Sequence, residues 1–195
     1  PPPDVILLYN FGDRDRPHAV SVPPGSGPKV KKRYDAFVEK MLTELEKSFE
    51  SEGYIAKRNQ IDAHHQERTD QLLEGIEGEA NARGFILSRT GNALTLSVAD
   101  AEGNSLSEEA YEALSPQEKE DLEAKAEELQ GGLEDALRRI RTLEKETDET
   151  VEKLAREVAS SVVRPLIEEM KAEMEGVPRI VSHLDDVQKD ILDKV

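Results

Sequence analysis

The hydrophobic positions change their period along the chain, and each change marks an expected element. Residues 4–9 form an apolar run and residues 18–22 alternate, so both are predicted strands joined by a polar turn. From residue 29 to about residue 83, apolar side chains recur at three- and four-residue steps, which predicts a long helix. The apolar stripe fades between residues 56 and 71, and Gly53 is a candidate break or bend.

A segment with a period of two follows this helix. Gly84 is a suitable helix C-cap. Residues 85–98 alternate on either side of Gly91-Asn92, which predicts a β-hairpin with a tight turn. Ser107 is then expected to cap a short helix through the sequence SEEAYEAL.

A second long helix is predicted to begin at Pro116. Ser115 precedes this proline and Glu118 lies at the third helical position, which together form a capping-box pattern. Gly131 and Gly132 make an interruption of this helix plausible. The expected coiled-coil seam contains Ala126, Leu129, Leu133, Ala136, Ile140, Leu143 and Thr147, and continues after a slip through Val151, Leu154, Val158 and Val162.

These elements predict a mainly α fold. The two long helices should pair as an antiparallel coiled-coil arm over residues 29–176, with the hairpin at its tip. The strand pair of residues 1–28 and a closing helix in residues 177–195 should form the base. Because an apolar strand opens the chain and no cap closes its last helix, we expect an excised part of a larger protein.

Composition supports an elongated helical shape. Hydrophobic residues make up 36% of the chain and charged residues 35%, which leaves little apolar surface for a thick core. The net charge of −16 disfavours nucleic acids and anionic membranes as partners. Residues 102–135 hold twelve acidic and two basic side chains, so this region should be electronegative. The absence of cysteine, of a signal peptide and of a membrane-length apolar run suggests the cytoplasm.

No catalytic, cofactor or metal site emerges from the residues. The loop PPGSGPK lacks the order of a phosphate-binding loop, so a structural turn is favoured over nucleotide binding. His64 and His65 are adjacent, which places them on different sides of a helix, and they are predicted to be exposed. His18 and His183 stand alone. Ser160, Ser161 and Lys171 lie far apart along one helix, which argues against a serine–lysine pair.

The hairpin is the candidate binding surface. It carries more apolar side chains than a free ribbon exposes, so one face should be covered, either by the helix around Tyr111 or by a partner. The candidate contact residues are Phe85, Ile86, Leu87, Leu94, Leu96, Val98 and Tyr111.

The opening segment NFGDRDRPHAVSVPPGSG resembles the helical domain of bacterial Lon-like proteases. The matching residues are Asn10, Phe11, Asp13, Arg16, Pro17, Pro23, Gly25 and Gly27. The order of the later parts is also similar to this family: a long helix, the entry Arg83-Gly84-Phe85 to a hairpin, the segment LSEEAYEALSPQE, a second long helix and a closing helix.

The resemblance implies that the chain is a regulatory or recognition arm and not a catalyst. The parent would couple a split AAA+-like module, with ATP and Mg²⁺ as its cofactors if it is ATP-dependent, to a peptidase with a serine nucleophile and a lysine base. Unfolded or damaged proteins would be its substrates, and the parent would form a ring, expected to be a hexamer. Neither Walker motif nor the peptidase dyad maps onto this sequence. The alternatives are a stand-alone chaperone-like or scaffolding coiled coil and, less favoured, a free-standing enzyme.

Overall fold

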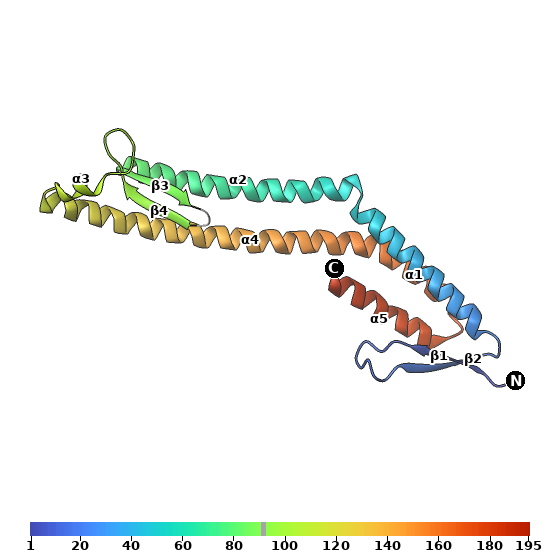
Figure 1. Ribbon diagram of the computed structural model, residues 1–195. Helices are drawn as coiled ribbons and strands as arrows, with labels where there is room; N and C mark the ends of the chain where they lie inside the picture. The colour runs from blue at the N-terminus through green and yellow to red at the C-terminus, as the bar shows by residue number, and fades with distance from the viewer. Residues whose placement is uncertain (91–92) are drawn as a thin grey trace. The chain divides into compact units, whose positions relative to one another are not determined.

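The computed structural model describes residues 1–90 and 93–195, and it confirms a mainly α fold (Figure 1). The chain forms two compact units. Unit 1 contains residues 1–59 and 150–195, and unit 2 contains residues 60–149. Two long helices, α2 (Glu52–Ala82) and α4 (Pro116–Glu173), contribute residues to both units.

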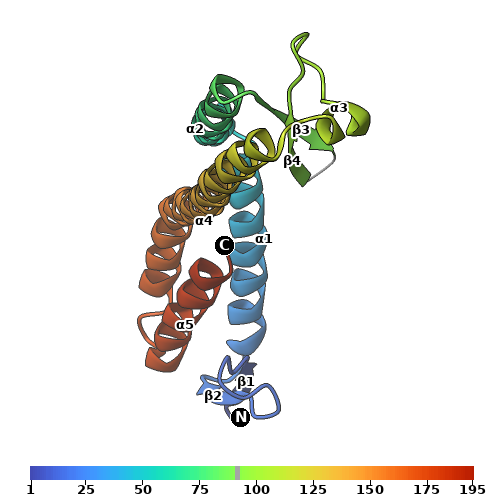
Figure 2. The ribbon, with the colours of Figure 1, turned by 90° about the vertical axis from the view of Figure 1, so that its left-hand side faces the viewer.

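Unit 1 begins with the predicted strand pair. β1 (Asp4–Leu8) and β2 (His18–Val22) are antiparallel, with Ile6 opposite Val20. Helix α1 (Gly27–Phe49) follows, and α5 (Pro178–Lys194) closes the chain. In Figure 2, α1, α5 and the C-terminal part of α4 lie beside one another, which agrees with the single apolar core that they form with the strands.

The first long helix is divided, but not at Gly53. Helix α1 ends at Phe49 and α2 begins at Glu52, and Gly53 lies inside α2. Ser51 causes the break, because its hydroxyl accepts a hydrogen bond from the Tyr54 N–H at 3.2 Å and so caps α2. The prediction of one helix from residue 29 to residue 83 was therefore wrong at this point.

The core of unit 1 lies where α4 meets α1, α5 and the inner face of the strand pair. Alternation on the strands turns Ile6, Leu8, Val20 and Val22 toward it. The most completely buried side chains are Val163, Ile167, Ile180 and Leu184.

Unit 2 contains the predicted β-hairpin, and the predicted helix caps lie on either side of it. β3 (Phe85–Thr90) pairs with β4 (Ala93–Val98), and Gly84 precedes β3 at a φ of 83°, which a residue without Cβ adopts easily. The predicted turn at Gly91-Asn92 lies outside the described residues. Ser107 caps α3 (Glu108–Glu112) by accepting from the Ala110 N–H at 3.2 Å.

The capping box at the start of α4 is confirmed. The backbone N–H of Ser115 donates to Glu118 Oε2 at 2.8 Å, and the Glu118 N–H donates to Ser115 Oγ at 3.3 Å. The Ser115 hydroxyl also donates to Glu118 Oε2 at 2.6 Å, and this bond, together with the one from the Ser115 N–H, lowers the pKa of Glu118 below its ordinary value. The helix then continues through Gly131 and Gly132, so the expected interruption is absent from α4, all of whose residues are described.

The predicted seam of α4 is correct through Leu154 and shifts beyond it. Leu129, Leu133, Ala136, Leu143 and Leu154 are buried, and the other predicted positions, Ala126, Ile140, Thr147 and Val151, are half-buried with no better-buried neighbour one residue away. Farther along, Val158 and Val162 are only half-buried, whereas Ala159 and Val163 are almost wholly buried. The shift has a physical cause, because this part of α4 packs against several elements of unit 1 and no longer against one helix.

Candidate functional site

The two faces of the β3–β4 hairpin differ in their role. Residues directly opposite each other point to the same face, so Phe85 with Val98 and Leu87 with Leu96 share one face. That face packs on α4, where Phe85 forms a cluster with Ala80 and Leu129, together with Leu96, Val98, Leu122 and Ala126. The expectation that one face must be covered is confirmed. The residues that cover it come from α2 and α4, which differs from the two covers expected, the helix around Tyr111 or a partner.

This packing changes the list of candidate contact residues. Phe85 is only 3% exposed, so it is a core residue and cannot offer a free contact surface. Leu96 and Val98 are half-buried against the same cluster. The remaining candidates, Ile86, Leu87, Leu94 and Tyr111, are half-buried, and their role in binding stays a prediction.

An apolar surface in unit 1 was not identified as a candidate from the sequence. Val5 and Leu7 are 62% and 66% exposed on the outer side of β1, and Tyr9, directly after the strand, is 47% exposed. A strand that is apolar on both faces is typical of a sheet covered on both sides, so the uninterrupted run VILLY was the available signal.

The loop before α1 is a structural turn. The carboxylate of Asp4 accepts a hydrogen bond from the Gly27 N–H at 2.8 Å, at the position where an anion would bind a helix N-terminus. A Cβ on Gly27 would lie 3.0 Å from the same carboxylate oxygen, so a larger residue would require the Asp4 side chain to shift. Asp4 thus supplies the negative charge that a phosphate would otherwise bring.

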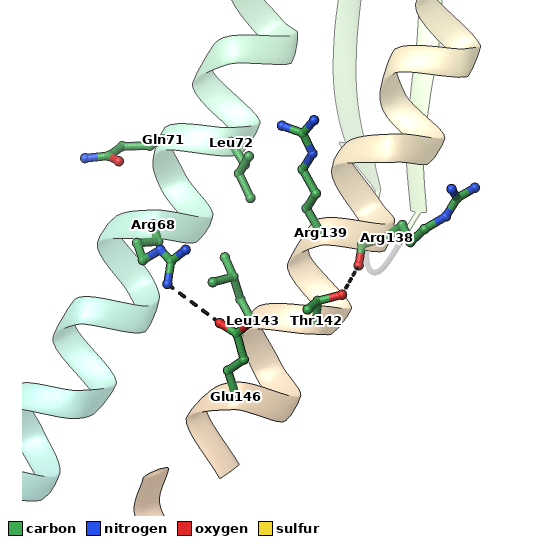
Figure 3. Close-up of a pocket in the computed structure, with 8 residues that line it drawn as sticks. All are labelled: Arg68, Gln71, Leu72, Arg138, Arg139, Thr142, Leu143 and Glu146. Carbon is green, nitrogen blue, oxygen red and sulfur yellow. Dashed lines mark hydrogen bonds and ion pairs between the residues drawn. The ribbon is translucent and has the colours of Figure 1, made fainter. Parts of the chain in front are cut away.

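A groove runs between α2 and α4 in unit 2 (Figure 3). It has a volume of about 440 Å³, and Leu72 and Leu143 point into it from opposite helices. An ion pair of 3.8 Å between Arg68 Nη1 and Glu146 Oε2 crosses one end. Arg138 also lines the groove, and its guanidinium points away from α2 in Figure 3.

His65 is not exposed as predicted. It is half-buried at the α2–α4 seam, where its Nδ1 lies 3.1 Å from Thr147 Oγ1. The Thr147 hydroxyl donates to the Leu143 carbonyl at 2.7 Å, so its remaining role toward His65 is that of acceptor. The pair is a polar layer in the seam.

His183 is also more than a lone side chain. It is 6% exposed in the core of unit 1, stacked on Phe11 at 5.6 Å between ring centroids and tilted toward Tyr34 at 6.1 Å. Burial lowers the pKa of His183; His18 adds to this effect and Asp186 opposes it. Burial also raises the pKa of Tyr34 to about 12.

The serine and lysine side chains of α4 are used locally. Lys171 Nζ binds Asp185 at 2.6 Å and Glu168 at 2.8 Å, and these two bonds raise the pKa of Lys171. A lysine base needs the opposite shift. Ser161 Oγ donates to the Val158 carbonyl at 2.7 Å. Among the described residues, no three His, Asp or Glu side chains gather closely enough to hold a metal ion.

A family model described as the Lon-like LonC helical domain matches residues 4–37. The match covers β1, β2 and the first part of α1, which are the elements that carry the opening motif. It confirms the resemblance to a helical domain of Lon-like proteases. No curated protein matches the chain. No helix within residues 1–90 and 93–195 is both apolar enough and long enough to cross a membrane.

Proposed function

We propose that this chain is the helical domain through which a Lon-like serine protease engages its substrates or gates their entry. The family match to residues 4–37 carries the proposal. The parent protease degrades unfolded or damaged proteins in the cytoplasm, and it assembles as a hexamer. Its AAA+ module uses ATP and Mg²⁺ if the protease is ATP-dependent.

The hairpin supports a role in binding. Ile86 lies on the outer face of the hairpin, and Leu87 and Leu94 lie on the face of Phe85. All three keep part of their apolar surface open to solvent, while α4 holds the other end of the hairpin in place. A rigid support beneath partly exposed apolar side chains suits an extended, unfolded segment, since backbone and apolar contacts do not require a folded partner.

The test uses the full 195-residue chain and a labelled, permanently unfolded polypeptide. Leu94→Ser and Ile86→Ser should each weaken binding several-fold, because each removes apolar contact area without touching the core cluster. Thr95→Ala is the matched control, since Thr95 is exposed on the same hairpin and lacks a large apolar group. Circular dichroism and hydrogen exchange verify that the hairpin remains folded.

Equal affinities for the wild type, both serine variants and the control would reject the hairpin as a contact site. The assay in the parent protease separates binding from gating. If degradation of an unfolded substrate falls while binding is unchanged, the domain acts as a gate.

The second candidate is a stand-alone chaperone-like or scaffolding coiled coil, and the pairing of α2 with α4 in unit 2 also supports it. The sequence encoded on either side of this chain in its reading frame distinguishes the two hypotheses. A downstream serine–lysine peptidase module supports the protease domain, and a frame without one favours the scaffold.

A further inference from the structure

The face of α4 opposite the seam of unit 2 carries a segregated pattern of charge. Residues 102–135 hold twelve acidic and two basic side chains, whereas residues 136–145 hold four basic and one acidic. On one exposed face the order along α4 is Glu120, Glu123, Glu127, Glu134, Arg138, Arg141 and Lys145.

Helical geometry places these side chains in one stripe. Glu120, Glu127, Arg138 and Lys145 follow one another at seven, eleven and seven residues, which are close to whole numbers of turns. The buried residues Leu129, Leu133, Ala136 and Leu143 lie on the opposite side. The stripe therefore points away from α2 and is open to solvent.

Within the chain this stripe is only weakly neutralised. Arg138 pairs with Asp135 at 3.5 Å and Lys145 with Glu149 at 3.6 Å, and all four side chains are more than half exposed. Such pairs contribute little and exchange easily. Among residues 1–90 and 93–195, Glu120, Glu127 and Arg141 make no ion pair.

We propose that this stripe is an interface at which α4 of a second copy of the chain docks antiparallel. A two-fold axis near Gly132 places Glu120 against Lys145 of the second copy and Glu127 against its Arg138. The same axis brings Glu123 opposite Arg141 of the second copy. Every acid in the first half of the stripe then meets a base in the second half.

The pattern favours a second copy over an unrelated partner because it is complementary to itself. A two-fold interface needs one surface that fits its own rotated image. The stripe meets this need because its charge changes sign close to its midpoint, and Glu134, the one acid beyond the axis, falls opposite Gly131. Gly131 lies near that midpoint, and a Cβ built there meets nothing within 4 Å. The two helix backbones can therefore approach closely where they cross. The inference does not depend on the proposed function.

Two charge-reversal variants of the full chain test the interface. E120K/E127K leaves Glu123 and Glu134 as the only acids of the stripe, and R138E/K145E leaves Arg141 as its only base. Sedimentation equilibrium at low salt should show the wild-type mass rising from 21.8 kDa toward twice that value with concentration, and returning to the monomer at high salt. Each variant alone should stay monomeric.

Two further samples are decisive: a mixture of the two variants, and a variant that carries all four substitutions. An equimolar mixture of the two variants should associate more tightly than the wild type, and the fourfold variant E120K/E127K/R138E/K145E should associate as the wild type does. A mixture that remains at 21.8 kDa overturns the proposal. So does a wild type whose association the charge reversals leave unchanged.

The chain contains no cysteine, so single cysteines report the orientation. The antiparallel arrangement predicts that Ala124→Cys cross-links to Thr142→Cys in a mixture, while neither variant cross-links efficiently to itself. Two copies of residue 124 would lie roughly 25 Å apart, at ~1.5 Å per residue on either side of the axis. Efficient cross-linking of Ala124→Cys to itself means a parallel pair and contradicts the interface.

Discussion

Units 1 and 2 are built from similar parts, but they bury their apolar side chains to different extents. Each combines amphipathic helices with a two-stranded sheet. In unit 1, α4 packs against α1, α5 and a sheet, and Val163, Ile167, Ile180 and Leu184 are fully buried. In unit 2, Ala80 is the one buried residue of α2, whose residues are all described. Leu129 of α4 is fully buried at the point where the hairpin adds a third packed element.

The difference shows that the number of packed elements, and not the apolar period, sets the depth of a core. Both parts of α4 carry an apolar residue every three or four positions. Where two helices and a sheet pack against the apolar face of α4, its side chains are buried. Where one helix faces it, an open groove remains beside Leu72 and Leu143.

Core truncations should reveal this contrast most strongly. We expect Ile167→Ala to destabilise unit 1 by about 4 kcal/mol. Ile167 is fully buried, so its truncation leaves a cavity that is enclosed by protein. Leu143→Ala should cost unit 2 about 2 kcal/mol, because Leu143 borders an open groove that can fill with water.

Native-state hydrogen exchange measures the two costs separately, since the units need not unfold together. Amides of residues 163–174 should respond to Ile167→Ala, and amides of residues 133–147 should respond to Leu143→Ala. Equal losses in both units would remove the distinction between deep and shallow cores.

The pH dependence of stability should also differ between the units. Because burial lowers the pKa of His183, the unfolded chain binds its proton more readily than the folded chain does. The stability that neutral His183 contributes is fully present above its ordinary pKa of 6.5, and it declines as pH falls through 6.5 toward the lowered folded value.

The variant His183→Phe keeps a flat ring against Phe11 and Tyr34 but cannot take up a proton. Its unit 1 should therefore lose less stability between pH 7 and pH 5 than the wild type does, as measured by denaturant unfolding followed at unit 1 amides. Parallel pH profiles for the two proteins would show that His183 has no such role.

Local sequence signals predicted the elements that depend on neighbouring residues. The strand pair, the hairpin and the caps at Ser107 and Ser115 were all found, because each rests on side chains within a few positions of the backbone groups they bind. The break at Ser51 was placed at Gly53 instead. A serine cap and a flexible glycine give similar signals when they lie two residues apart.

The features that were missed depend on distant residues. The polar pair of His65 and Thr147 joins positions 82 residues apart, and it follows only from the register of two helices. Burial of His183 depends on Phe11 and Tyr34 from other elements. No local pattern distinguishes a buried histidine from an exposed one.

The capping box gives a smaller effect confined to the start of α4. We expect Ser115→Ala to lower the stability of this helix end by about 1 kcal/mol, because the Glu118 N–H loses its side-chain acceptor. Hydrogen exchange of residues 117–121 measures the loss, and Ser161→Ala, within the same helix, is the control. An unchanged rate at residues 117–121 would show that the cap does not hold this end.

The smallest expected effect is a gain at Gly131. Glycine in a helix interior costs up to about 1 kcal/mol relative to alanine. A Cβ at Gly131 meets nothing within 4 Å, so Gly131→Ala should stabilise unit 2 by somewhat less than this amount.

Gly132→Ala is the variant to compare with it. Its Cβ would lie 3.5 Å from Ile76 Cδ1 and add an apolar contact at the seam. Measured at high salt, where the two copies are apart, Gly132→Ala should stabilise unit 2 at least as much as Gly131→Ala. A loss of stability at Gly132 would mean that the seam is packed too closely there to accept one methyl group, and the shallow core of unit 2 would then be tighter than its burial indicates.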